Sequence, residues 1–144
     1  MNELLKTVLA NHLIAYYRLS AYHWNVTGKD FPQYHDFFGE LYEQYEDQID
    51  ILAEYIRIQG ESVPYSIKEI YEYATLDEEE HSTLTLRLML LGAKQVNDEL
   101  IKSMVGLFDI AEAAQKQGIA DYAAGMIDKY KKNNWMIQSC LSEG

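Results

Sequence analysis

Four side chains between residues 22 and 55 could together bind a metal ion. His23 and His35 supply imidazole nitrogens, and Asp50 and Glu54 supply carboxylates. These donor types suit iron, zinc and manganese alike, and so small a set leaves coordination positions open for water or an oxidant. The pattern therefore indicates a metal site with room for chemistry, but it does not select the metal.

The two histidines flank a short polar break between two predicted helices. Residues 27–30 contain a glycine, which suits the end of a helix, and Asp30, which suits an N-cap. A short loop makes the two helices antiparallel neighbours. His23 lies about one turn before the break and His35 about one turn after it. We therefore expect the two imidazoles to lie at similar heights and to approach one another.

The two carboxylates share one face of the second predicted helix, because residues four positions apart lie on the same side of a helix. Asp50, however, follows His35 by fifteen positions. At about 1.5 Å of rise per residue, this separation is roughly 22 Å. Metal–ligand bonds to nitrogen or oxygen are only about 2.0–2.6 Å long. A single chain therefore cannot bring all four side chains to one ion.

Helical phasing separates an apolar arc from an acidic arc on this second helix. The apolar arc contains Phe37, Phe38, Leu41, Tyr45, Ile49, Leu52 and Ile56. The opposite arc contains Glu43, Glu46, Asp47, Asp50 and Glu54. Since the carboxylates point away from their own core, a two-fold axis across the hairpin could set the histidines of one subunit beside the acids of the next. Each such interface would hold two equal sites.

The hairpin resembles the Dps family, which comprises the mini-ferritins or DNA-binding proteins from starved cells. The resemblance rests on His23-Trp24-Asn25, a second histidine twelve positions after the first, and the pair Asp50 and Glu54 within Ile-Asp-Ile-Leu-Ala-Glu. A long connection and a terminal helix with Trp135-Met136 extend it over the rest of the chain. It implies an all-α, ferritin-like four-helix bundle with one long crossover carrying a short helix, assembled into a hollow shell of twelve subunits.

The resemblance also implies the chemistry. Family members oxidise Fe(II), commonly with hydrogen peroxide, and store ferric oxide in the cavity, which limits hydroxyl-radical formation and oxidative damage. His23 and His35 of one subunit, with Asp50 and Glu54 of its neighbour, are the implied metal ligands and catalytic residues of the ferroxidase. Zinc could substitute for iron at such a site.

Gly39 departs from the family pattern, in which an aspartate often stands four residues after the second histidine. Asp36 and Glu40 are close in sequence but lie on other faces of the helix. The departure puts a second iron position in doubt. It also leaves an alternative open, in which the chain forms a non-catalytic shell that holds zinc or another divalent ion.

Composition indicates one ordered domain spanning residues 1–144. The chain is 48% hydrophobic and has only two prolines, which favours an all-α fold with a substantial core. The single cysteine, Cys140, excludes an intrachain disulfide and favours a reducing, cytoplasmic compartment. Polar residues such as Lys6 and Arg18 interrupt the N-terminal apolar stretch, so we expect neither a signal peptide nor a membrane span.

The formal net charge of −11 argues against affinity for phosphate backbones and suits a surface that attracts cations. We see no basic terminal tail, so direct DNA binding is unexpected, and a chromatin-compacting role is the weakest of the three functions considered. The acidic run of residues 77–81 is best explained as a solvated loop or first helical turn.

The predicted bundle helices cover residues 2–26, 32–59, a segment following Asn97 as N-cap, and 120–141. Gln117-Gly118 is expected to end the third of them. Ser66 and Glu69 form a capping-box pattern for a short helix over residues 66–73. Residues 83–91 are apolar enough to be helical. His12, on the apolar stripe of the first helix, is interpreted as a hydrogen-bonded structural histidine.

Overall fold

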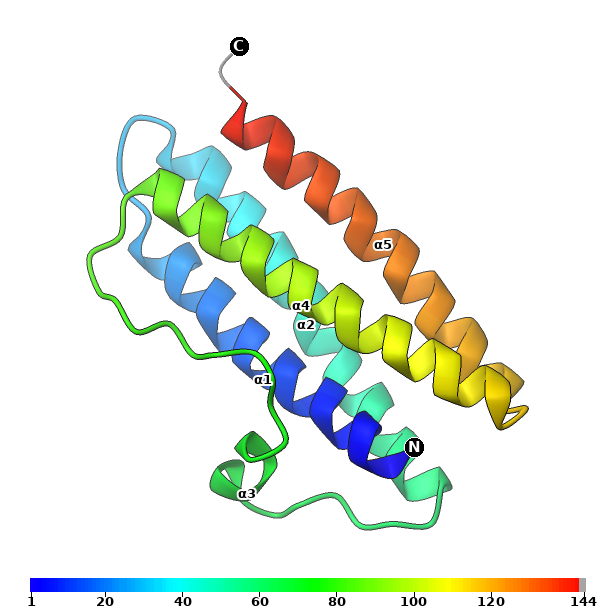
Figure 1. The fold of residues 1–144 in the computed structure, drawn as a ribbon. Coiled ribbons are helices and arrows are strands. Elements are labelled where there is room, and N and C mark those ends of the chain that lie inside the picture. The colour runs from blue at the N-terminus through cyan, green and yellow to red at the C-terminus, as the bar shows by residue number, and fades with distance from the viewer. Residues whose placement is uncertain (143–144) are drawn as a thin grey trace.

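The computed structural model describes residues 1–142, which form helices and contain no strand. Figure 1 shows a four-helix bundle with a short fifth helix in one long connection. The bundle consists of α1 (Asn2–Asn25), α2 (Phe31–Ile58), α4 (Leu86–Ala113) and α5 (Gln117–Leu141), and the connection carries α3 (Ile67–Tyr71). The predicted all-α, ferritin-like architecture is confirmed. The expected unit of residues 1–144 also includes Glu143 and Gly144, which lie outside the described residues.

The bundle is built from two antiparallel hairpins. α1 packs on α2, α4 packs on α5, and contacts between α1 and α4 join the two pairs (Figure 1). The crossover from α2 to α4 returns along the length of the bundle, so α4 runs parallel to α2 and begins near the α1–α2 turn. One long crossover between the second and third core helices is the connectivity of ferritin-like bundles.

Each long helix buries one apolar face. The side chains at the centre of the core include Leu5, Val8 and Leu19 of α1, Phe38, Leu41, Leu52 and Ile56 of α2, Leu100, Met104 and Leu107 of α4, and Ile137 of α5. The acidic arc predicted for α2 is exposed along its whole length. The phasing of α2 is therefore confirmed. No helix within residues 1–142 combines the length and the apolar character needed to cross a membrane.

A hydrogen-bonded polar network also lies inside the bundle. The Nδ1–H of His12 donates to the Val8 carbonyl at 2.7 Å, and its Nε2 accepts from the Tyr130 hydroxyl at 2.8 Å. Asn97 accepts from the Tyr45 hydroxyl at 2.9 Å and donates to the Tyr130 carbonyl at 2.5 Å. These bonds link all four long helices. His12 is thus the structural histidine that the sequence predicted.

The predicted start of the third core helix is wrong. α4 begins at Leu86, after Thr85, whose hydroxyl accepts from the Leu88 amide at 3.2 Å. The sequence predicts one helical segment within residues 83–91 and another after Asn97, but α4 is a single helix that runs from Leu86 to Ala113. Asn97 resembles a cap in sequence because asparagine favours caps. In the folded chain its amide finds partners across the bundle instead.

The predicted boundary between the last two helices is also wrong. Gln117 begins α5, and the turn consists of residues 114–116. The left-handed position of this turn is taken by Gln115, with φ of 57°, and not by Gly118. The predicted cap of the short helix is confirmed, because the Ser66 hydroxyl accepts from the Glu69 amide at 3.1 Å. Asp30 occupies the N-cap position of α2 but makes no side-chain cap bond.

Candidate functional site

His23 and His35 meet at the loop end of the α1–α2 hairpin, beside the turn that joins the two helices. His23 is in the last turn of α1 and His35 is in the second turn of α2. Their rings stack with centroids 3.7 Å apart and an angle of 15° between the planes. The predicted approach of the two imidazoles is confirmed, since a short loop and matched heights leave them facing one another.

Each histidine hydrogen-bonds the backbone of the other. The Nδ1 of His23 lies 2.5 Å from the His35 carbonyl oxygen, and the Nδ1 of His35 lies 2.7 Å from the His23 carbonyl oxygen. A carbonyl can only accept, so each Nδ1 carries the hydrogen. In the neutral rings both Nε2 atoms then keep a lone pair. A backbone carbonyl that fixes the tautomer in this way is a common support for a metal-binding histidine.

Aromatic neighbours hold both rings in place. Phe31 stacks on His35 with centroids 4.8 Å apart, and Tyr42 packs edge-on against His23 at 5.2 Å. Both histidines are half-buried. The imidazoles are therefore oriented before any metal arrives, which reduces the ordering that binding would require.

Asp50 and Glu54 are exposed on the acidic face of α2, far along the helix from His35. Hydrogen bonding and charge repulsion from Asp50 raise the pKa of Glu54. A cation bound between the two carboxylates would relieve this repulsion. No three His, Cys, Asp or Glu side chains within residues 1–142 gather into a metal site. The protomer thus brings the two histidines together, but it does not bring the two carboxylates to them.

Within residues 1–142, the interior of the bundle offers no alternative metal site. In di-iron carboxylate bundles, glutamates from the helices project inward and hold the metals. Among the described residues here, no aspartate or glutamate is buried, and the corresponding space contains the network of His12, Asn97 and Tyr130. A metal site in this chain must therefore be built on the surface of the protomer.

Two further positions lie close to the histidine pair in sequence. Trp24 is 61% exposed and contacts Tyr17 edge-on at 6.0 Å. Gly39 is buried beside His23, while Asp36 and Glu40 are both exposed. Neither flanking carboxylate takes the place that an aspartate at position 39 would have occupied.

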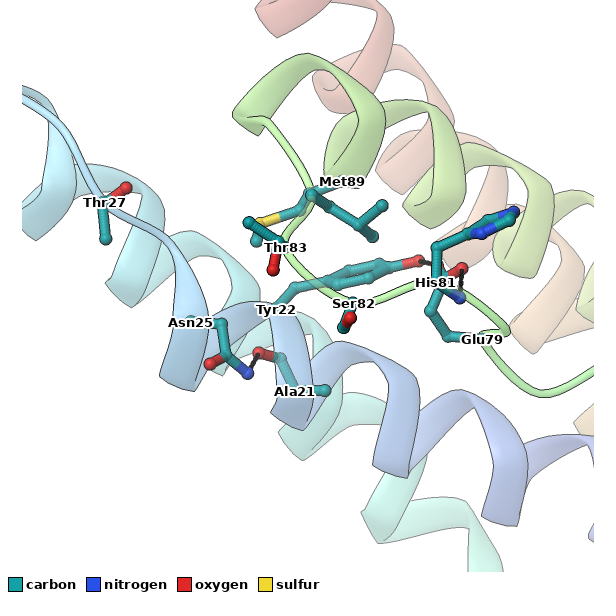
Figure 2. Close-up of a pocket in the computed structure, with 10 residues that line it drawn as sticks. Ala21, Tyr22, Asn25, Thr27, Glu79, His81, Ser82, Thr83 and Met89 are labelled. Atoms are coloured by element: carbon teal, nitrogen blue, oxygen red, sulfur yellow. Dashed lines mark hydrogen bonds between the residues drawn. The ribbon is translucent and has the colours of Figure 1, made fainter.

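A second cluster, which the sequence did not reveal, holds the crossover on α1. Figure 2 shows Tyr22 pointing from α1 toward Glu79 of the crossover. The Tyr22 hydroxyl donates to Glu79 at 2.6 Å, and Arg18 lies 3.6 Å from the same carboxylate and donates to the Asp77 carbonyl at 2.9 Å. Burial and then the bond to Glu79 raise the pKa of Tyr22 to about 12.

This cluster borders a cavity of about 450 Å³ between the end of α1 and the crossover (Figure 2). The acidic run of residues 77–81 is irregular and mostly exposed, as predicted for a solvated loop. Glu79 is the exception, because it is half-buried and bonded to Tyr22. The polar groups here bond mainly to one another. We therefore infer that the cluster serves to attach the crossover to α1.

Comparison with known proteins identifies relatives over nearly the whole chain. The family model of the ferritin-like domain matches residues 2–144. The DNA protection during starvation protein of Brevibacillus brevis is 29% identical over 140 residues, which cover 96% of this chain and 92% of that protein. Dps from Staphylococcus aureus is 29% identical, with a TM-score of 0.92 over 99% of this chain and 95% of that one.

A third relative carries a description of its chemistry. The crystal structure of a Dps protein from Vibrio cholerae O1 is described as that of a member of a broad superfamily of ferritin-like diiron-carboxylate proteins. It is 25% identical to this chain, with a TM-score of 0.92 over 98% of this chain and 88% of that one. These likenesses extend over the hairpin with the two histidines as well as over α4 and α5.

Proposed function

Because the chain belongs to the ferritin-like domain family and, within it, to the Dps proteins, we propose that it is a ferroxidase that stores iron. Fe(II) is oxidised at sites shared by two-fold-related subunits, and the ferric product collects inside a homo-oligomeric shell of twelve subunits. Hydrogen peroxide is the expected oxidant. Two Fe(II) ions supply the two electrons that, with two protons, reduce one peroxide to two waters. The reaction removes both precursors of hydroxyl radical.

The reciprocal bonding of His23 and His35 is the observation that carries this proposal. Each ring donates its Nδ1–H to the other's carbonyl, so both Nε2 atoms are available as ligands in a fixed orientation. Two nitrogens and two carboxylates leave coordination positions for water and oxidant, as redox chemistry of iron requires.

The location between subunits follows from the position of the carboxylates. Asp50 and Glu54 are exposed and like-charged, and along the helix they lie roughly 22 Å and roughly 28 Å from His35. A second chain related by a two-fold axis can supply these acids to the histidines of the first chain and receive the same in return. Iron held between the two carboxylates would offset the repulsion that raises the pKa of Glu54.

A complementation experiment tests this shared site directly. One chain carries His23→Ala and His35→Ala, and the other carries Asp50→Ala and Glu54→Ala. Neither chain alone can build a complete site. In shells assembled from equal amounts of both, half of the two-fold interfaces are mixed, and each mixed interface contains one intact site. We expect Fe(II) oxidation with peroxide to return to about one quarter of the wild-type rate.

The control places all four substitutions in one chain, which leaves every interface without a complete site even when it is mixed with either double variant. If mixing the two double variants restores no oxidation, although both co-assemble, the ligands do not come from two subunits. Size-exclusion chromatography with light scattering reports the co-assembly and the number of subunits.

The competing function is a non-catalytic shell that holds zinc or another divalent ion, and Gly39 is the residue that favours it. Adding Fe(II) and peroxide to metal-free protein separates the two functions. Rapid oxidation with a soluble ferric product supports the ferroxidase. Binding of Zn²⁺ without any acceleration of Fe(II) oxidation supports the alternative.

A further inference from the structure

Gly39 lies inside α2, one turn beyond His35, and is buried. A glycine inside a helix weakens it relative to alanine, because glycine loses more backbone freedom on folding. Of the glycines in the described residues, only Gly28 and Gly60 have a positive φ. The backbone at position 39 therefore does not require glycine. The presence of a glycine there must instead be explained by the space that a side chain would fill.

That space is next to the imidazole of His23. A Cβ at position 39 would lie 3.0 Å from both Cε1 and Nδ1 of His23, which is closer than ordinary van der Waals contact. The ring is constrained in other directions by stacking on His35 at 3.7 Å and by Tyr42 at 5.2 Å. Its Nδ1 is also bonded to the His35 carbonyl. A side chain at position 39 would have to push the ring against these contacts.

We propose that Gly39 is a positioning residue of the metal site, because the absence of a side chain there lets the imidazole of His23 pack directly against α2. In this position the Nδ1 of His23 reaches the His35 carbonyl, and its Nε2 stays free to bind a metal. The inference rests on the proposed function and deepens it. The departure from the aspartate common in relatives then concerns more than a carboxylate, because a side chain restored at position 39 would have to move His23 by a few tenths of an ångström.

Binding of Co²⁺ to metal-free protein tests the proposal, since its visible absorption reports the ligands without any turnover. Gly39→Ala and Gly39→Asp are compared with wild type. Gly125→Ala is the matched control, because Gly125 lies inside α5 and a Cβ there would meet no atom within 4 Å. We expect both Gly39 variants to bind Co²⁺ at least about 10-fold more weakly, the effect typical of losing a residue that orients a ligand. The control should bind as wild type does.

A crystal structure of Gly39→Ala supplies a second readout, in which the His23 imidazole should be shifted away from position 39 by a few tenths of an ångström. Wild-type Co²⁺ affinity in Gly39→Ala would overturn the proposal. Tighter binding by Gly39→Asp would also overturn it, by identifying position 39 as a vacant ligand position. If Gly39→Ala fails to fold while Gly125→Ala folds, no side chain fits beside His23, which supports the packing on which the proposal depends.

A different result would contradict the proposed function and not the role of Gly39. A wild-type protein that binds Co²⁺ but does not accelerate Fe(II) oxidation would remove the ferroxidase activity and leave the positioning role of Gly39 standing.

Discussion

At the scale of residues, one detail distinguishes the candidate ligands from the structural histidine. His12, His23 and His35 each bond a backbone carbonyl through Nδ1. The Nε2 of His12 is used inside the core, where it accepts from Tyr130. Within the described part of the chain, no side chain bonds the Nε2 of His23 or His35. The free nitrogen, and not the presence of a histidine on an apolar stripe, marks these two as candidates for metal binding.

The burial of His12 makes folding stability depend on pH. Burial lowers the pKa of His12 from 6.5 to about 4. Below pH 6.5 the unfolded chain takes up a proton that the folded chain does not, so stability falls as the pH falls and levels off below about 4. For this shift the loss is about 3 kcal/mol in the free energy of unfolding. Urea unfolding measured across this range should show the decline.

His12→Gln isolates the contribution of this histidine. The variant should lose the part of the pH dependence between pH 6.5 and 4 that comes from His12, even if it is less stable throughout. His81→Gln is the control, because it removes an exposed histidine and leaves the buried one in place. Parallel curves for wild type and His12→Gln would show that His12 does not titrate as described.

At the scale of elements, the crossover is held on α1 by side chains of that helix. Asn11 is fully buried and makes three bonds: its amide nitrogen donates to the Thr75 hydroxyl, and its oxygen accepts from the amides of Thr75 and Leu76. Arg18 and Tyr22 hold the next part of the connection. A connection without regular structure is thus fixed along the outside of α1, which leaves α4 free to begin beside the α1–α2 turn.

Asn11→Ala should release the first of these attachments. The substitution leaves the amide of buried Leu76 without a partner, and an unsatisfied buried group costs about 1–3 kcal/mol. We expect a loss of about 2–3 kcal/mol in the free energy of unfolding and faster proteolysis within residues 72–85. Asn25→Ala is the control, because Asn25 is exposed and bonds only within its own helix. Unchanged proteolysis in Asn11→Ala would mean that Asn11 does not hold the crossover.

At the scale of the whole molecule, the charge sets the range of partners. A net charge of −11 on each chain is multiplied in any homo-oligomer. The resulting potential attracts Fe(II) and repels polyanions. A lone protomer also exposes large apolar side chains such as Trp24, Ile58 and Tyr65, which is consistent with a chain that associates with its own copies.

Binding to DNA is expected to be weak despite the names of the relatives. Affinity for duplex DNA comes mainly from Lys and Arg placed against phosphates, and it falls steeply with salt. We expect no gel shift of linear duplex DNA by the assembled protein at roughly physiological ionic strength. A shift that persists at that ionic strength would contradict this prediction and would point to a basic surface created by assembly.

The local pattern of the chain was sufficient to predict the bundle and the histidine pair. Apolar periodicity places Phe38, Leu41 and Tyr45 on the buried face of α2, because a helix repeats every 3.6 residues whatever its neighbours are. The short break after α1 sets the heights of His23 and His35 in the same local way. The length of α2 separates Asp50 from His35 in any fold that keeps the helix continuous.

Features that depend on distant partners could not be predicted from the local pattern of the chain. Asn97 favours a cap in isolation, but in the folded chain it bonds Tyr45 and Tyr130 from other helices, so α4 continues through it. The attachment of the crossover by Asn11 joins residues more than sixty positions apart. The packing of His23 against Gly39 likewise joins two helices, α1 and α2. Such contacts follow from where whole helices pack, and no local period of the sequence encodes them.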